Sequence, residues 1–271
     1  MKFLGFRRPD GKVGIRNHVL VLATVGCAAE AARQTADGIY GAVSFINQNG
    51  CGESSRNLRR TQDVLVGMAA NPNVYGVVAI GLGCEMNRMD GFIKELRART
   101  DKPIEGLLIQ EEGGTIETVA MAKKIARRMV IEASMCRREE CDISELMLGI
   151  ECGGSDATSG LVSNPVMGII SDRIIAAGCQ LIVFTTGRGN AIGSAVAPVM
   201  KVTANGDTAR KLSDNIDLDM SAVLEEGVSL DAMADITMQQ ILDTLSGRLT
   251  SAEALKLGYS EAVISRACEY C

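Results

Sequence analysis

Tryptophan is absent from this chain of 271 residues, and aromatic residues together make up only 3% of it. So few aromatic rings leave little material for the stacking platforms on which proteins bind single-stranded nucleic acid. The basic residues are scattered, and the net charge is −5. A basic footprint for nucleic acid is therefore missing as well, and we expect no nucleic-acid partner.

Long apolar runs are also lacking. No uncharged apolar stretch reaches the roughly 18 residues that a membrane-spanning helix needs. The first ten residues carry charges without a preceding apolar core, which is not the pattern of a signal peptide. We therefore expect a cytoplasmic protein with no membrane contact, in which the nine cysteines are reduced thiols.

Histidine occurs once, as His18, at the predicted start of a strand. This position favours a structural or surface role, so Ser-His-Asp and Cys-His catalysis are not expected. Proton transfer would then depend on carboxylates, a lysine, a tyrosine or a metal-bound hydroxide. The phosphate-binding pattern Gly-x-x-x-x-Gly-Lys-Ser/Thr is absent too, and nothing in the sequence supports nucleotide binding.

What the chain does contain is a succession of short apolar runs, each followed by a polar, glycine-rich turn and then, in most cases, a helical pattern. Such runs are typical of strands buried on both faces of a parallel sheet. They cover residues 19–23, 42–46, 74–80, 104–109, 146–150 and 181–184. Six units of this kind predict an α/β fold with a mostly parallel sheet and helices on both faces.

The last third of the chain has a different pattern. Residues 197–202 fit a further strand, and helical patterns follow near residues 229–245 and 250–257. We interpret this region as a helical closure that packs on the sheet. We therefore expect a parallel α/β core over residues 1–190 and a C-terminal part over residues 191–271, although the two can also form one continuous domain.

The glycine-rich turns carry most of the residues suited to chemistry. Every turn follows a strand, and open parallel sheets bind their ligands outside the carboxyl ends of the strands. We therefore expect Cys27, Cys51, Cys84 and Cys152 to gather along one edge of the sheet. Thiolates bind transition metals and iron–sulfur clusters, so Cys51, Cys84 and Cys152 are predicted metal ligands. The alternative for each of them is a small buried apolar residue.

The turn Glu151-Cys152-Gly153-Gly154-Ser155-Asp156 brings a thiol, a hydroxyl and a carboxylate together. Its glycines, Gly153 and Gly154, allow the backbone to approach a ligand closely. We predict catalytic roles for Ser155, Asp156 and Glu85, the acids acting as oxygen ligands or proton carriers. The alternative for this turn is an ordinary strand-to-helix connection with Asp156 as the helix cap.

A second turn, Thr185-Thr186-Gly187-Arg188-Gly189, frames a guanidinium with glycines and hydroxyls. Such a group suits bidentate capture of a carboxylate, and phosphate capture would need similar parts. The predicted substrate-binding residues are Arg188, Thr185, Thr186, Gly153, Gly154 and Asn164. Of the remaining cysteines, Cys136, Cys141, Cys268 and Cys271 are expected to be surface thiols, and Cys179 to lie in the core.

Five motifs together resemble the altronate/galactarate dehydratase family. They are residues 10–17 (Asp-Gly-Lys-Val-Gly-Ile-Arg-Asn), the turns Gly50-Cys51-Gly52 and 81–85 (Gly-Leu-Gly-Cys-Glu), residues 152–165 (Cys-Gly-Gly-Ser-Asp-x-x-Ser-Gly-x-x-x-Asn-Pro) and residues 184–189 (Phe-Thr-Thr-Gly-Arg-Gly). The resemblance implies a hydro-lyase that removes water from sugar acids. It also implies iron, as Fe²⁺ or a labile iron–sulfur cluster, or another divalent metal such as Mn²⁺.

The same family includes the large subunit of sulfolactate sulfo-lyase, which eliminates sulfite. Compared with the family, this chain lacks a small N-terminal domain, which a separate subunit could supply, and we expect a homo-oligomer. It also lacks a long segment between Ser171 and Leu181, as if two family stretches had been joined. The alternatives to a sugar-acid dehydratase are therefore a sulfo-lyase large subunit and a shortened, non-catalytic relative that serves binding or assembly.

Overall fold

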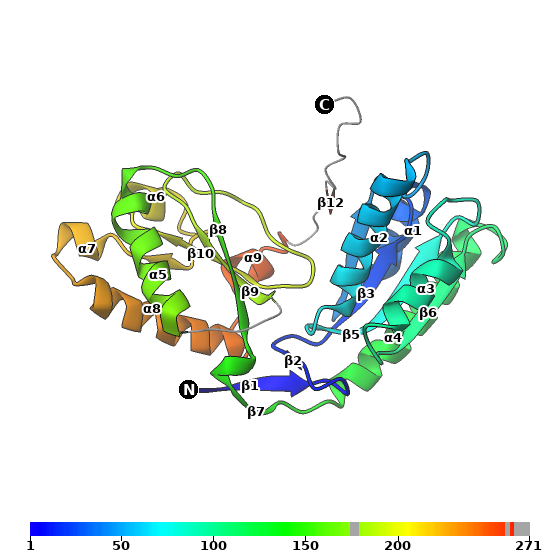
Figure 1. Cartoon of the computed structure of the whole chain (residues 1–271), viewed down its shortest axis with the longest axis horizontal. Coiled ribbons are helices and arrows are strands. Elements are labelled where there is room, and N and C mark those ends of the chain that lie inside the picture. Colours follow the sequence, from blue (N-terminus) through cyan, green and yellow to red (C-terminus); the bar gives the residue numbers. More distant parts are fainter. Residues whose placement is uncertain (174–178, 258–260, 263–271) are drawn as a thin grey trace. The chain divides into compact units, whose positions relative to one another are not determined.

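The structure, a computed structural model, describes residues 1–173, 179–257 and 261–262. The chain divides into two compact units, which Figure 1 colours along the sequence. Unit 1 consists of Met1–Arg7 and Arg138–Gly258, and unit 2 of Arg8–Arg137 and Tyr259–Cys271. The boundary that we expected at residue 190 thus falls inside unit 1.

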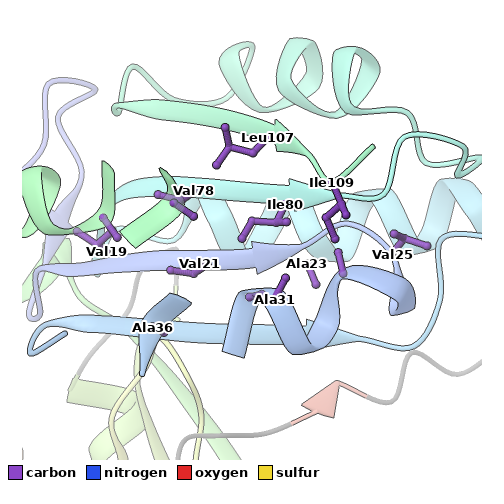
Figure 2. Close-up of a cluster of buried hydrophobic side chains, with 14 of the residues drawn as sticks. Val19, Val21, Ala23, Val25, Ala31, Ala36, Val78, Ile80, Leu107 and Ile109 are labelled. Carbon is purple, nitrogen blue, oxygen red and sulfur yellow. The ribbon is translucent and has the colours of Figure 1, made fainter. Parts of the chain in front are cut away.

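Unit 2 is built on a five-stranded parallel sheet in the order β12-β4-β3-β5-β6. Its strands are β3 (His18–Ala23), β4 (Ala42–Asn47), β5 (Val74–Gly81), β6 (Ile104–Leu108) and β12 (Glu261–Ala262), and the short β2 (Val13–Gly14) precedes them. Figure 2 shows Val19, Val21 and Ala23 of β3 packed beside Val78 and Ile80 of β5. The apolar runs of the sequence therefore form the centre of this sheet, as predicted.

Four helices cover this sheet: α1 (Ala29–Ala36), α2 (Ser55–Ala70), α3 (Met89–Arg97) and α4 (Thr115–Ser134). The chain passes from β3 to β4 in one direction and from β4 to β5 and β6 in the other. Right-handed crossovers therefore place α1 on one face and α2 and α3 on the opposite face. The direction reverses between β3 and β5, and such a switch point is where open α/β sheets bind ligands.

Unit 1 contains a second parallel sheet, in the order β11-β10-β9-β8. Its strands are β8 (Met147–Cys152), β9 (Cys179–Thr185), β10 (Val199–Thr203) and β11 (Leu218–Asp219). Helices α5 (Asn164–Arg173) and α8 (Leu230–Leu245) pack on each other, and α9 (Ser251–Ala254) packs on β10. The shorter α6 (Gly206–Lys211) and α7 (Ala222–Glu225) complete the unit. The predicted α/β class with parallel strands, flanking helices and a helical C-terminal part is confirmed.

The predicted strand units form two parallel sheets, four in unit 2 and two in unit 1, rather than one sheet. Between these sheets in the sequence lies β7 (Glu139–Asp142), which pairs antiparallel with β1 (Lys2–Arg7). Neither strand is among the six runs predicted from the sequence. Both strands are rich in charge, and their partners lie more than a hundred residues apart, so no local pattern reveals the pairing.

The pairing of β1 with β7 corrects one prediction about the cysteines. Cys141 is 2% exposed within β7, whereas we expected a surface thiol. Its neighbours Glu139 and Glu140 are exposed, which gave the segment a misleadingly polar sequence. Cys136 is exposed, as predicted. Cys268 and Cys271 lie outside the described residues, as does the side chain of Cys179.

A search of the described helices for one with the length and apolar character needed to cross a membrane finds none.

Candidate functional site

Three loops meet at the carboxyl edge of the sheet in unit 2. The backbone amide of Gly26, after β3, donates to the carbonyl of Asn49, after β4 (3.1 Å). The amide of Asn87, after β5, donates to the carbonyl of Gly50 (3.1 Å). The loops after β3, β4 and β5 carry Cys27, Cys51 and Cys84, respectively, and all three thiols are exposed.

Buried asparagine side chains also connect the same loops by hydrogen bonds. Asn47 and Asn87 each donate an amide hydrogen to the carbonyl of Thr24, at 3.4 and 3.1 Å. Asn47 also accepts a hydrogen bond from the amide of Asn49 (2.8 Å) and is fully buried. Asn47 therefore serves to shape the loop that carries Cys51.

Glu85 has its carboxylate turned into the protein. The side chain is buried and accepts hydrogen bonds from the amides of Gly83 (2.6 Å) and Leu82 (3.2 Å) and from Thr24 Oγ1 (3.2 Å). These bonds fix the loop that carries Cys84. The described geometry thus gives Glu85 a positioning role, and its predicted role as a catalytic acid or ligand stays a prediction.

Glu53 plays the equivalent part for the neighbouring loop, and sequence reasoning missed it. It is buried, and its two carboxylate oxygens accept from the amide of Gly50 (2.8 Å) and from Thr61 Oγ1 (2.9 Å). A signal was present, because an acid follows Cys51 by two residues and Cys84 by one. Each of these cysteine loops therefore has its own buried carboxylate as a brace.

The predicted residues of unit 1 meet at the carboxyl edge of the second sheet. The carbonyl of Gly154 accepts from the amides of Gly187 (3.1 Å) and Arg188 (2.9 Å). The amide of Gly153 donates to the carbonyl of Thr185 (3.1 Å). The turns after β8 and β9 are thereby joined into one platform.

The glycines in these turns are required by space and conformation. Gly154 has φ +63°, a region that other residues rarely adopt. A Cβ on Gly153 would lie 2.8 Å from the Phe184 ring. Thr186 is fully buried, and its hydroxyl accepts from the amide of Gly189 (2.9 Å), so it shapes the second turn. Its predicted role in substrate binding stays a prediction.

Asp156 acts as a cap at the start of the helical segment that follows. One oxygen accepts from the amides of Thr158 (2.9 Å) and Ser159 (3.2 Å), and the other from Asn205 Nδ2 (2.8 Å). Burial works to raise the pKa of this carboxyl, but the hydrogen bonds outweigh it and hold the pKa below its usual range. The geometry supports the cap interpretation, and a direct catalytic role for Asp156 stays a prediction.

Cys152 ends β8 as an exposed thiol, with its Sγ 2.8 Å from Ser155 Oγ. The hydrogen bond from Ser155, followed by one from Thr185, lowers the pKa of this thiol against a small opposing effect of burial. The Thr185 hydroxyl also lies 3.0 Å from Asn164 Oδ1, at the start of α5. The thiolate is the form that reacts and binds metals, so Cys152 is the cysteine whose surroundings favour that form.

Replacing Ser155 by alanine is expected to raise the pKa of Cys152. Because the thiolate is the reactive form, alkylation of Cys152 at pH 7 should become several-fold slower. Iodoacetamide labelling followed by peptide mass spectrometry measures this rate for Cys152 separately from the other thiols. Ser213→Ala, in an exposed loop of the same unit, is the control and should leave the rate unchanged. Equal rates in wild type and Ser155→Ala would contradict the assignment.

Arg188 is exposed beside this platform. Within the described residues, its guanidinium has no hydrogen-bond or ion-pair partner, whereas its backbone amide is held by Gly154. An anchored backbone with an uncommitted guanidinium suits capture of a carboxylate from solution. Unit 1 thus brings together Cys152, Ser155, Asn164, Thr185 and Arg188, and unit 2 holds Cys51, Cys84 and Glu85.

A complete metal site is not formed by the described side chains. Among residues 1–173, 179–257 and 261–262, no group of three His, Cys, Asp or Glu side chains is placed to hold a metal. The buried acids near the cysteines are engaged with amides, and in the C-terminal part Asp217 accepts from the amides of Lys201 and Ser251 (both 2.7 Å). The donors left over are exposed thiols, which suit iron chemically.

Fold and sites together define a parallel α/β protein whose loops after the strands present thiols, hydroxyls and an uncommitted guanidinium. The chain belongs to the D-galactarate dehydratase/altronate hydrolase family. The second domain of this family matches residues 5–134, and the C-terminal domain of D-galactarate/altronate dehydratase matches residues 143–178 and 173–269. The resemblance found in the sequence is thereby confirmed.

Three relatives illustrate the relationship. The (2R)-sulfolactate sulfo-lyase subunit beta of Chromohalobacter salexigens is 28% identical, over 98% of both chains. The altronate dehydratase of Escherichia coli is 34% identical over 64% of this chain, and the galactarate dehydratase (L-threo-forming) of the same organism is 33% identical over 42%. These two alignments cover only 36% and 23% of the dehydratases.

The chain is shorter than the full-length dehydratases. The alignment with the sulfo-lyase subunit extends over 386 positions, whereas this chain has 271 residues, so a long gap interrupts it. The two stretches that match the C-terminal domain meet at residues 173–178. This is the place, between Ser171 and Leu181, where the sequence indicated that two family stretches had been joined.

Proposed function

We propose that this chain is a lyase that dehydrates a sugar acid of the altronate or galactarate type by β-elimination. The observation that carries this proposal is the match of both dehydratase domains, which together extend over nearly the whole chain. Four of the five motifs, all except residues 10–17, lie in turns after strands of the parallel sheets, where α/β proteins bind ligands. Elimination of water needs a group that holds the carboxylate and groups that move protons.

In this proposal Arg188 binds the substrate carboxylate. Its guanidinium is exposed and uncommitted within the described residues, and its backbone is anchored to Gly154. Ser155 and Asn164 are exposed on the same platform and are the groups placed to contact hydroxyls of the sugar acid. Gly153 and Gly154 allow the substrate to approach the backbone of this platform closely, and Thr185 and Thr186 maintain the conformation of the turn after β9.

The predicted cysteines follow strands of two different sheets, Cys51 and Cys84 in unit 2 and Cys152 in unit 1, rather than one sheet edge. We further propose that iron is the cofactor and that thiols are its ligands, with Cys51 and Cys84 as the candidates in unit 2 and Cys152 as the candidate in unit 1. The support is chemical: all three thiols are exposed, and the pKa of Cys152 is lowered toward the metal-binding thiolate. Such a metal, when bound, polarises oxygen atoms of the substrate. Metal analysis of Cys84→Ser and Cys152→Ser after anaerobic iron loading tests the ligand set, and unchanged iron content in both variants would refute it.

A second candidate is sulfite elimination from sulfolactate. The relative that aligns over 98% of both chains is named a sulfo-lyase subunit beta, which favours this reaction and a separate partner subunit. Both kinds of substrate carry a carboxylate, so Arg188 can bind either of them. A third outcome is a shortened relative that binds sugar acids without converting them.

One assay separates these functions. The purified protein, loaded anaerobically with Fe²⁺, is offered altronate, galactarate and sulfolactate while 2-keto acid and sulfite are measured. We expect 2-keto acid from a sugar acid and a loss of at least tenfold in kcat/KM for Arg188→Lys, with Arg210→Lys as an exposed control. Sulfite from sulfolactate alone supports the second candidate, and calorimetric binding without turnover overturns the lyase proposal.

A further inference from the structure

Lys201 is a fully buried lysine in the middle of β10, with 0% of its side chain exposed. Its Nζ atom has no hydrogen-bond partner within residues 1–173, 179–257 and 261–262. Burial lowers the pKa of this amine, and the nearby Asp217 opposes the shift. A buried charge is costly, so burial shifts the balance of this amine toward its neutral form, which carries a free electron pair.

Strand pairing places Lys201 close to the edge that carries the proposed site. Lys201 is paired with Phe184 of β9, and Phe184 with Glu151 of β8. The next row toward the carboxyl edge contains Val202, Thr185 and Cys152, whose side chains point to the opposite face of the sheet from Lys201. An extended lysine side chain spans about 6 Å, nearly two residues of a strand, so the amine has the reach to serve this edge.

The face on which Lys201 lies is apolar. Phe184 and Val199, which share this face, form a cluster with Ala252 of α9 and with Leu257. The ring of Phe184 also lies against Gly153, in the turn of the proposed site. An amine in such surroundings is kept away from bulk water, and exclusion of water is a common condition for a strong base in an active site.

The acids that the sequence offered for proton transfer are engaged elsewhere. The carboxylate of Glu85 accepts three hydrogen bonds in its loop, and that of Asp156 caps a helical segment and binds Asn205. The only histidine lies at the first residue of β3, at the opposite end of the strand from the cysteine loop. A base for the lyase reaction therefore has to be found among other residues.

We propose that Lys201 is the general base of the elimination, a role that rests on the proposed lyase function. The neutral amine takes the proton from the carbon next to the substrate carboxylate, and the electron pair of that C–H bond forms the C=C bond. The bond between the β-carbon and its hydroxyl breaks, and the leaving hydroxide becomes water by taking one proton, either from the Lys201 ammonium or from solvent. The resulting enol converts to the 2-keto acid, and the Lys201 ammonium returns its proton to the hydroxide or to solvent.

A general base with a lowered pKa makes a specific prediction for how kcat/KM depends on pH. The amine acts only when neutral, so kcat/KM should rise with pH along a limb set by the pKa of Lys201, which lies below the ordinary value of 10.5. The charged groups on the paired row and on or beside the elements packed against β10 are Glu151, Asp217, Asp219, Asp207, Arg210, Lys211, Glu253 and Lys256. Of these, Asp217 raises the pKa of Lys201.

The test compares Lys201→Met and Lys201→Arg with the wild type in the iron-loaded full chain. Two rates are measured in D₂O: exchange of the substrate proton next to the carboxylate, and formation of 2-keto acid. General bases contribute about 10²–10⁴-fold, so we expect both rates to fall at least a hundredfold in Lys201→Met. Exogenous ethylamine should restore part of the exchange in Lys201→Ala, which a merely structural role would not allow.

Lys102→Met is the matched control, because Lys102 is the other buried lysine that the structure describes. Burial lowers its pKa to about 7, but its Nζ donates to the carbonyls of Ala69 and Asn71 at the end of α2. Its loss should reduce stability and leave the exchange rate per folded molecule unchanged. Circular dichroism checks that each variant is folded. If Lys201→Met does not fold, the rates are compared between the wild type and Lys201→Arg instead.

Two different failures are distinguishable. If wild type and Lys201 variants exchange and dehydrate the substrate within tenfold of each other, Lys201 is not the base although the lyase function stands. If the wild type neither exchanges nor converts any sugar acid, the lyase function itself fails. A normal lysine pKa for Lys201, measured by NMR on ¹⁵N-lysine-labelled protein, would overturn the base assignment in either case.

Discussion

A Glu85→Ala variant is expected to lose roughly 2–4 kcal/mol of its free energy of unfolding. The substitution leaves the amides of Leu82 and Gly83 and the hydroxyl of Thr24 without their acceptor in a buried place. Unsatisfied buried donors are costly, and the loop that carries Cys84 should become mobile. Urea unfolding followed by circular dichroism measures the change, and the rate of Cys84 alkylation reports on the loop.

The control for this prediction is Glu111→Ala, an exposed glutamate in the same unit, whose effect should stay within about 0.5 kcal/mol. The result separates two roles for Glu85. A proton carrier that contributes nothing to the fold would leave the free energy of unfolding unchanged and reduce only turnover. Wild-type stability in Glu85→Ala would therefore refute the positioning role and revive the catalytic one.

Gly187→Ala is expected to destabilise unit 1 by roughly 2–4 kcal/mol, because the new Cβ has no room. It would lie 2.2 Å from Asp156 Cγ and 2.3 Å from its Oδ1. The carboxylate would have to leave its bonds with Thr158, Ser159 and Asn205. The backbone of Gly187 is not in the left-handed region, so the effect comes from space alone.

Gly168→Ala is the matched control for Gly187→Ala in the same unit. It lies in α5 with nothing within 4 Å of the added Cβ, so alanine should stabilise the helix by about 0.5–1 kcal/mol. Both variants are compared by thermal and urea unfolding. A Gly187→Ala protein as stable as Gly168→Ala would mean that the turn after β9 and Asp156 do not pack as described.

Strands and helices were predictable because their signals are local. The run at 19–23 corresponds to β3, and the helical pattern near 229–245 corresponds to α8. The pairing of β1 with β7 was not predictable in this way. Its charged residues hide the single buried thiol of Cys141, and its partner strand is far away in the sequence.

The sequence predicted which reactive residues lie in the turns, but not which way their side chains point. A sequence shows that Glu85 and Asp156 stand beside glycines, but not whether a carboxylate turns outward to a ligand or inward to an amide. In both turns the amide donors lie within three residues of the acid and are available without any ligand. Lys201 was overlooked as a base because a lysine within an apolar run looks like an ordinary strand residue.

The pairing of β1 with β7 also determines how the chain is assembled. Gly5 lies opposite Glu139, so the chain leaves unit 1 and re-enters it at neighbouring points of one ladder. Residues 8–137 are therefore an insertion, nested between two strands of its host. During synthesis, residues 8–137 are completed before β7 leaves the ribosome, so β1 can pair with β7 only after this insertion has been made. Because unit 1 lies on both sides of the insertion, no single truncation of the chain separates the two units.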